Sequence, residues 1–302
     1  MKAFIIVFLF FFGTIYGQQV ADSTYVPPIL KPEYQSGQGP VVFIDAGHHN
    51  FHTKDGRYKA FATLLERDGY NVKSYEGLFS EEALDKSRIL VISNALNKKN
   101  VGHWYVPTYS AFTDAEIEVV KEWVKNGGSL FLIADHMPMG GAAKKLAAAF
   151  NFEFTDGFAM ESGKGRRGYF SRKNNGLQEN EITNGRNENE RVEEVTSFTG
   201  QAFQIPEYAK PILVLDEKYV NKLPDTAWVF TEKTRTQTAT GWSQGAFAGY
   251  GKGRIVLWGE AAMFTAQLGG SNARKFGMNR EDAKENYKLL LNIIHWLDVK
   301  IE

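Results

Sequence analysis

Histidine and carboxylate side chains gather in three short segments of this chain. The first segment, residues 45–52, reads Asp-Ala-Gly-His-His-Asn-Phe-His, the second is Asp135-His136, and the third ends in Glu260. Four of the six histidines lie in the first two segments. Each segment follows a short apolar run of the kind that forms a buried strand. If these strands are neighbours, their polar ends can meet beyond one edge of a sheet.

These residue types suit a divalent metal ion, with zinc as the first candidate cofactor. Imidazole and carboxylate groups bind such ions at about 2.0–2.2 Å, and the ion lowers the pKa of a coordinated water to about 7. The predicted metal ligands are His48, His52 and His136. The predicted catalytic carboxylates, as general bases or as partners that orient a histidine, are Asp45, Asp135 and Glu260.

The same residues also have a structural interpretation. Adjacent histidines in a loop after a strand often hydrogen-bond the backbone and hold the turn. Asp135 can cap the start of the helix that follows it. In that case the clusters hold loops in place and bind no ligand.

Other side chains are candidates for contacting a substrate. His103 and Trp104 lie in an aromatic loop that can stack on a sugar ring. Arg166 lies in a cationic turn that can meet an acidic group. Asn50 and Asn279 can supply polar contacts. Each of these has packing, or a solvated surface, as its alternative role.

The elements that must position these residues alternate between strands and helices. A capping box at Thr113-Asp-Ala-Glu116 and the pair Gly127-Gly128 bound the clearest helix. Such alternation predicts an α/β fold with three layers, a mostly parallel sheet flanked by helices. We also expect a polar insertion at about 155–205 and a late β-hairpin that turns at 251–253. The expected strands are 40–45, 71–75, 88–93, 129–134, 212–215, 227–230, 244–250 and 254–258, and the expected helices are 58–65, 80–83, 113–126, 142–150 and 287–297.

The beginning of the chain is typical of an exported protein. Lys2 precedes an apolar run from Ala3 to Phe12, and Gly17 follows, which predicts a signal peptide over residues 1–17. A spanning helix needs about 20 apolar residues, so no membrane span is expected after cleavage. We expect a periplasmic or secreted protein, with residues 18–39 as a linker or surface arm and 40–302 as a single domain.

Composition excludes several classes of function. The chain has 35 Lys and Arg residues and 35 Asp and Glu residues, so it lacks the basic balance of a nucleic-acid-binding protein. It has no cysteine, which excludes disulfides and thiolate catalysis. The expected partner is a small molecule or a carbohydrate.

Two segments resemble the class I glutamine-amidotransferase-like superfamily. Residues 112–135 resemble its helix that ends in Gly-Gly and leads into the strand before the nucleophile, and residues 249–260 resemble the end of the same fold. The chain is similar to an exported branch of this superfamily and, more distantly, to ThuA-like proteins. This resemblance implies a flavodoxin-like sheet. Residues 134–141 stand at the nucleophile turn without a cysteine, so glutamine hydrolysis is excluded.

Three functions remain open at this stage. The first is a periplasmic hydrolase that acts on a carbohydrate or related small substrate. A metal ion bound by the His and Asp clusters is one way in which the reaction could be assisted. The second is a non-catalytic module of the same fold that binds a ligand or a partner. The third follows from 41–48, which resembles the opening of zinc-dependent N-acetylmuramoyl-L-alanine amidases and implies a zinc ligand at His48. The second zinc histidine of those enzymes has no counterpart in 91–94.

Overall fold

A computed structural model describes residues 19–162 and 167–302 of the chain. The predicted signal peptide and Arg166 lie outside these ranges. Within the described residues, no helix has the length and apolar character needed to cross a membrane.

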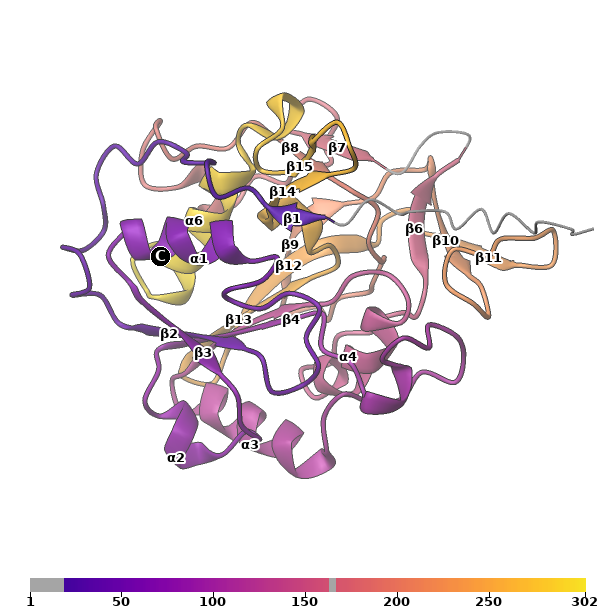
Figure 1. The fold of residues 1–302 in the computed structure, drawn as a ribbon, viewed down its shortest axis with the longest axis horizontal. Helices are drawn as coiled ribbons and strands as arrows, with labels where there is room; N and C mark the ends of the chain where they lie inside the picture. Colours follow the sequence, from indigo (N-terminus) through magenta and orange to yellow (C-terminus); the bar gives the residue numbers. More distant parts are fainter. Residues whose placement is uncertain (1–18, 163–166) are drawn as a thin grey trace, which may run out of the picture.

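A seven-stranded sheet forms the middle layer of the molecule (Figure 1). Its strand order is β3-β2-β4-β5-β13-β12-β9. All neighbours from β3 to β13 pair in parallel, and β12 is antiparallel to both of its neighbours. The predicted mostly parallel α/β sheet with a late hairpin is confirmed. The strands are β2 (Val41–Asp45), β3 (Asn71–Tyr75), β4 (Ile89–Ser93), β5 (Ser129–Ile133), β9 (Lys210–Val214), β12 (Ser243–Tyr250) and β13 (Gly253–Trp258).

Helices cover both faces of this sheet, which completes the three layers (Figure 1). On one face, α1 (Lys59–Arg67) and α6 (Asn286–Leu297) share a core with Phe131 and Trp258. On the other face, α3 (Asp114–Lys125) and α4 (Met139–Ala148) share a core with Leu132, and the short α2 (Glu81–Leu84) packs beside them. The predicted capping box is present at the start of α3.

The central strands β4 and β5 are buried at every position, as expected for parallel strands that have helices on both sides. Successive side chains alternate between the two cores, because a strand has a period of two residues. Ile89 and Val91 belong to the core under α1 and α6, whereas Leu90 and Ile92 belong to the core under α3. This alternation determines the face on which each polar residue beyond a strand end lies.

Smaller sheets extend from this body. Figure 1 shows a three-stranded sheet, in the order β11-β10-β6, that projects from one end. It joins part of the predicted insertion to residues after β9, and β7 pairs with β8 in a separate two-stranded sheet. The elements of these regions are β6 (Phe158–Glu161), β7 (Gly168–Ser171), α5 (Glu181–Asn184), β8 (Glu194–Ser197), β10 (Tyr219–Leu223) and β11 (Arg235–Thr238).

The strand predicted over 227–230 is wrong. This segment is a loop between β10 and β11, and Trp228 has a φ of 67°, in the left-handed region. A left-handed residue interrupts extended backbone, so an apolar run there cannot continue as a strand. The apolar side chains serve packing instead, since Trp228 and Phe230 both contact the ring of Phe158.

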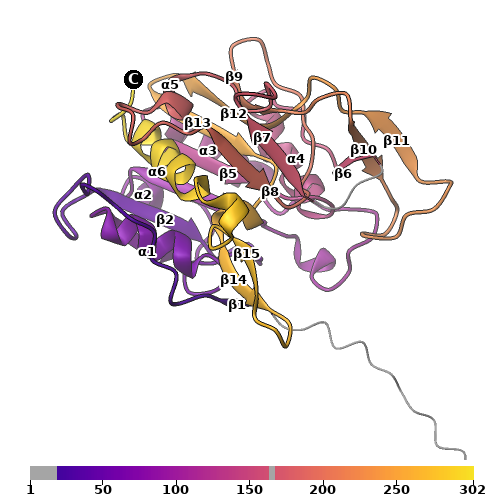
Figure 2. The ribbon, with the colours of Figure 1, turned by 90° about the horizontal axis from the view of Figure 1, so that it is seen from above.

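The segment before β2 lies on the surface of the body. Its strand β1 (Val20–Ala21) pairs with β14 (Ala266–Gly269), which also pairs with β15 (Arg274–Gly277) (Figure 2). Farther along, Tyr34 packs edge-on against Tyr70 at a centroid distance of 5.3 Å. The remaining elements are the 3-10 helices η1 (Lys98–Asn100), η2 (Ala262–Phe264) and η3 (Glu281–Ala283).

Two glycines of the β12–β13 hairpin form a matched pair for testing this packing. A Cβ at Gly253 would lie 2.1 Å from the carbonyl oxygens of Gly128 and Val124, whereas a Cβ at Gly249 would meet nothing within 4 Å. We expect Gly253→Ala to lower the free energy of unfolding by about 1–3 kcal/mol. Gly249→Ala should leave it unchanged or raise it by up to about 1 kcal/mol. Urea unfolding measures both, and equal effects of the two substitutions would contradict the close approach of α3 to β13.

Candidate functional site

Side-chain alternation separates the polar clusters at the strand ends. The carboxyl ends of β2, β4, β5 and β13 lie at one edge of the sheet because these strands are parallel. Ile44 packs in the core under α1 and α6, so the next residue, Asp45, points to the opposite face. Asp135 and Glu260 each lie two residues beyond the end of a strand whose last side chain packs under α1 and α6. The predicted cluster therefore forms two separate sites.

The first site is an ionic cluster centred on His48. Its Nδ1 lies 3.0 and 2.9 Å from the two carboxylate oxygens of Asp45, and its Nε2 lies 2.9 Å from Oε1 of Glu116. Burial alone would lower the pKa of His48, but hydrogen bonds to Asp45 and Glu116 and their charges outweigh it and raise the pKa above 6.5. Protonated His48 donates from both ring nitrogens to these carboxylates, and in that form neither nitrogen has a lone pair for a metal ion.

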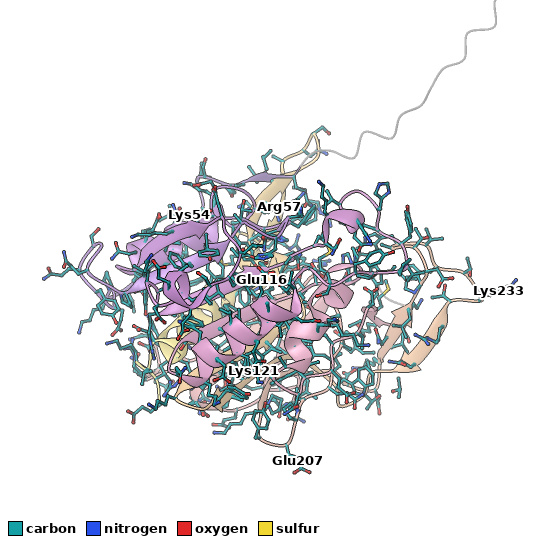
Figure 3. The ribbon with its side chains drawn as sticks, turned by 90° about the horizontal axis from the view of Figure 1, so that it is seen from below. Lys54, Arg57, Glu116, Lys121, Glu207 and Lys233 are labelled. Atoms are coloured by element: carbon teal, nitrogen blue, oxygen red, sulfur yellow. The ribbon has the colours of Figure 1, made fainter. Side chains whose placement is uncertain are left out.

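Glu116 joins this cluster to the start of α3, inside the body (Figure 3). Its Oε1 also accepts from the backbone N–H of Phe79 at 3.1 Å, and its Oε2 accepts from the backbone N–H of Thr113 at 3.1 Å. Burial would raise the pKa of Glu116, but the hydrogen bond from His48 and these backbone donors lower it. The cluster thus ties the loop after β2 to the capping box of α3.

Asp45 and Asn50 serve the same cluster. Asp45 is fully buried and accepts from His48, from the backbone N–H of Gly47 at 3.1 Å and from Nδ2 of Asn50 at 2.9 Å. Asn50 also accepts from the backbone N–H of His48 at 3.0 Å. These contacts hold the predicted base Asp45 and the predicted substrate contact Asn50 within the loop after β2, and Asn50 also donates to the carbonyl of Ser93 at 3.3 Å.

The second site lies at the ends of β4 and β5 and is organised by Asn94. Nδ2 of Asn94 lies 3.1 Å from Nδ1 of His52, and its Oδ1 accepts from the backbone N–H of Asp135 at 2.8 Å. Asn94 has a φ of 49°, which turns its side chain between these two partners. Burial, followed by the charge of Arg57, lowers the pKa of His52 to about 3, so this imidazole is neutral and accepts from Asn94.

Glu260 lies beneath Asp135 and is fully buried. Its two oxygens accept from the backbone N–H groups of Ala262 and Met263, each at 2.8 Å, so it holds the start of η2. Burial and the charge of Asp135 raise the pKa of Glu260 well above its ordinary value, although the backbone donors oppose them. Burial and these two carboxyls also raise the pKa of Tyr58, whose hydroxyl donates to the carbonyl of Ala261 at 3.2 Å.

His136 follows Asp135 and retains contact with solvent. Each of the two residues is 9% exposed. Nδ1 of His136 donates to the carbonyl oxygen of Met137 at 2.8 Å, and Nε2 lies 3.9 Å from Oδ1 of Asp135. The imidazole stacks on Phe158 at a centroid distance of 4.4 Å and meets the edge of Trp228 at 4.5 Å. Nε2 and the Asp135 carboxylate are thus held side by side at the end of β5.

Rings from four distant segments lie around His136, next to Asp135, and we call Phe51, Trp104, Phe158 and Trp228 the aromatic rim. The Trp104 ring lies 5.6 Å from Phe51 and 6.4 Å from His136, measured between centroids. The backbone N–H of Ala227 donates to the carbonyl of Trp104 at 2.8 Å, which brings the two tryptophan loops together. The predicted contact Trp104 therefore belongs to the site. His103 is exposed and lies beside Tyr105 outside the rim.

Asn279 is not brought to the rim. It is buried, and its Nδ2 donates to the carbonyl of Gln267 at 3.1 Å and to Oδ2 of Asp22 at 2.9 Å. These bonds join the loop after β15 to β14 and to the segment that follows β1. Asn279 therefore supports Gln267 from behind.

The predicted three-histidine metal site is not formed. His48 lies on the face of α3 with both nitrogens occupied, whereas His52 and His136 lie at the second site and bond Asn94 and a backbone carbonyl. No group of three or more His, Asp or Glu side chains in residues 19–162 and 167–302 is arranged to hold a metal ion.

Two hollows of the described surface lie away from Asp135. One has a volume of about 440 Å³ and is lined by residues of the 223–235 loop, which also carries Trp228. The other, of about 310 Å³, lies near the start of β4 and the end of α3 and is lined by Arg88 and Trp123 among others. The first therefore shares a loop with Trp228 but is not lined by the rim, and the second is at the opposite edge of the sheet.

Sequence reasoning missed Asn94, Tyr58 and Trp228. Asn94 directly follows β4, so the rule that ligands lie beyond the carboxyl ends of strands was sufficient to find it. Tyr58 appeared only as part of an apolar helical face. Trp228 was assigned to a strand, and no local signal in the sequence indicates that its loop meets Trp104.

Comparisons with known proteins support the fold alone. No protein-family model matches the chain, and no curated protein is similar to it in sequence. The solved structure described as "mmIFT52 N-terminal domain" aligns with a TM-score of 0.57 and 14% identity, over 85% of this chain and 97% of that chain. The cytoplasmic protein STM1381 from Salmonella typhimurium LT2 aligns with a TM-score of 0.51 and 12% identity, over 85% and 98%.

Structural neighbours at low identity also include ThuA-like proteins. One from Bacteroides uniformis ATCC 8492 aligns with a TM-score of 0.49 and 12% identity, over 89% of this chain and 96% of that chain. At such identities a shared fold says nothing about the residues of a site, so function has to be argued from the side chains themselves.

The ionic cluster predicts a pH-dependent contribution of His48 to stability. Because the folded pKa of His48 lies above its ordinary value of 6.5, its contribution is complete below pH 6.5 and is lost as the pH rises through the folded pKa. We expect His48→Gln to cost about 3 kcal/mol at pH 6, since it leaves two buried carboxylates without their cation. The difference from the unsubstituted protein should shrink between pH 6 and pH 10 in urea unfolding. The exposed His103→Gln serves as control, and a pH-independent difference would refute the charged state of His48.

The two carboxyls of the second site predict a gain of stability on removing one charge. Because the folded pKa of Glu260 is raised, this residue destabilises the fold increasingly as the pH rises above 4.5. Asp135→Asn removes one cause of that shift and keeps an oxygen to accept from the backbone N–H of His136. We expect it to raise the free energy of unfolding by about 1 kcal/mol at pH 8, with a smaller effect at pH 5. The exposed Asp114→Asn should show no such trend, and a destabilised Asp135→Asn would count against the coupling.

Proposed function

We propose that the protein binds a small, hydroxyl-rich ligand, such as a carbohydrate, at Asp135 and His136. The observation that carries this proposal is the aromatic rim. Rings from four segments far apart in the sequence lie around the imidazole of His136, next to the carboxylate of Asp135, and each of these two residues is 9% exposed. If these rings served packing alone, there would be no need for the carboxylate of Asp135 to remain in contact with solvent among them.

The chemistry of these groups matches a sugar. Aromatic faces bury the apolar C–H surface of a sugar ring, while a few convergent polar groups bind its hydroxyls. Asp135 accepts from a hydroxyl, and Nε2 of His136 accepts from a second, because Nδ1 carries the ring proton that is donated to Met137. Asn94 holds the backbone of Asp135, so the acceptors are oriented before a ligand arrives.

Hydrolysis of the bound ligand is the second candidate function, and the pairing of Asp135 with Glu260 favours it. The charge of Asp135 acts on the buried Glu260, and carboxyls paired in this way are typical of acid–base sites. Asp135 is the candidate general base for a water molecule. Glu260 is fully buried with both oxygens bonded to backbone, so it is a positioning residue that holds the start of η2. This version of the hydrolase needs no metal ligand at His48.

The residues also bear on the amidase interpretation. Its zinc ligand would be His48, whose two nitrogens are bonded to Asp45 and Glu116. The geometry therefore favours the sugar-binding proposal over a zinc amidase. For location we propose the periplasm or the exterior of the cell, on the basis of the apolar N-terminal run.

Binding measurements on three variants test the proposal. We expect a neutral or acidic oligosaccharide to raise the melting temperature and to give a measurable Kd by calorimetry. Trp228→Ala and Asp135→Asn should each weaken binding at least about tenfold, through loss of stacking and loss of an acceptor. Tyr169→Ala, on an exposed side chain of β7, should bind as the unsubstituted protein does. Equal affinity in all variants would refute this site.

Chromatography of the incubated sugar separates binding from hydrolysis. Release of shorter products by the unsubstituted protein, lost in Asp135→Asn, supports the hydrolase. An unchanged sugar after prolonged incubation at saturating protein rejects hydrolysis and leaves the binding function.

A further inference from the structure

We infer that the ligand of this site is an acidic carbohydrate and that Arg57 binds its carboxylate or sulfate group. This inference rests on the proposed function, because it names the class of sugar that the aromatic rim accepts. It assigns a specificity-determining role to a residue that lies in the turn before α1, outside all of the sequence clusters considered above.

Arg57 borders the aromatic rim. Its guanidinium carbon lies 4.2 Å from the centroid of the Phe51 ring, and Phe51 in turn contacts Trp104. Phe51 is 38% exposed, so the guanidinium and this ring form part of a solvent-accessible edge. The Arg57 charge also contributes to lowering the pKa of the buried His52, which places its field inside the second site.

Neutral partners hold the Arg57 side chain in place. Nη1 donates to Oε1 of Gln267 at 2.9 Å and to Oε1 of Gln19 at 2.6 Å. Gln267 is itself buried, and its Nε2 donates to Oγ1 of Thr265 at 2.9 Å. Asn279 donates to the backbone carbonyl of Gln267 from behind. A guanidinium held by neutral amide oxygens is oriented, and these partners do not compensate its charge.

The charge of Arg57 has no counter-ion among the residues that the structure describes: no described carboxylate lies within 4.0 Å of its guanidinium. The cations on either side differ from it. Lys54 lies 3.1 Å from Glu66, and Lys59 lies 3.6 Å from Asp55. Figure 3 shows Lys54 and Arg57 in the same region of the molecule, whereas Lys233 lies at the far tip beyond β10. Among residues 19–162 and 167–302, Arg57 is thus a cation without a counter-ion, and it is located at the rim.

A partly buried cation without a counter-ion is costly, and an anionic ligand removes that cost. Guanidinium matches the planar oxygens of a carboxylate, and those of a sulfate, in a two-bond geometry that a lysine cannot reproduce. A sugar stacked within the rim would place its acidic substituent over Phe51, toward Arg57. Neutral sugars would keep the stacking and the contacts to Asp135 but would leave Arg57 unpaired.

The test compares three oligosaccharides that differ in one substituent. The probes are oligomers of galacturonate, of sulfated galactose and of neutral galactose, and Kd is measured by calorimetry. We expect at least one acidic probe to bind about tenfold tighter than the neutral one. Arg57→Gln should abolish that preference, and Arg57→Lys should retain part of it. Lys59→Gln removes the same charge from a compensated neighbour and should preserve the preference.

The outcomes separate this inference from the proposed function. Equal affinity for acidic and neutral probes, or an acidic preference that survives Arg57→Gln, overturns the role of Arg57 and leaves the sugar site standing. Failure of all three probes to bind overturns both. Melting temperatures identify a variant that does not fold. If Arg57→Gln does not fold, the affinities of Arg57→Lys for the acidic and neutral probes are compared instead. A full preference in Arg57→Lys would mean that charge, without guanidinium geometry, selects the ligand.

Discussion

The alternation of side chains along the parallel strands is the constraint on which both polar clusters depend. β2, β4, β5 and β13 end at one edge of the sheet, but a residue just beyond a strand can face either helix layer. Ile44 and Ile133 both pack under α1 and α6. Asp45 follows Ile44 by one residue and so faces α3, whereas Asp135 follows Ile133 by two residues and so faces α1 and α6. Proximity of strand ends therefore does not by itself bring polar side chains together.

The two faces use their buried charges differently. On the α3 face, His48 compensates Asp45 and Glu116, and every partner is satisfied within the fold. On the α1 face, burial and the charge of Asp135 raise the pKa of Glu260, so ionising Glu260 there costs stability. An arrangement of like charges that lowers stability is commonly retained in proteins where a functional site needs those charges. This contrast separates the structural cluster from the candidate site.

The site itself is completed by loops whose positions depend on long-range contacts. The loops of Trp104 and Trp228 meet because their backbones hydrogen-bond each other, and Phe158 comes from an insertion between α4 and β7. Arg57 is oriented by Gln267 of β14 and by Gln19, which precedes β1. Loops on a rigid scaffold commonly supply the residues that bind ligands, and here they set the shape and charge of the rim.

Much of the fold could be predicted from the sequence, because strands, helices and their caps depend on local periodicity: the capping box of α3 and the turn at 251–253 are such signals. The same reasoning identified Asp135, His136 and Trp104 as candidates. It could not identify their hydrogen-bond partners, and it placed His48 among metal ligands. The reason is distance along the chain: Glu116 is 68 residues from His48, and Asn94 is 41 residues from Asp135. Which side chains meet is decided by strand register and loop packing, which only the tertiary structure determines.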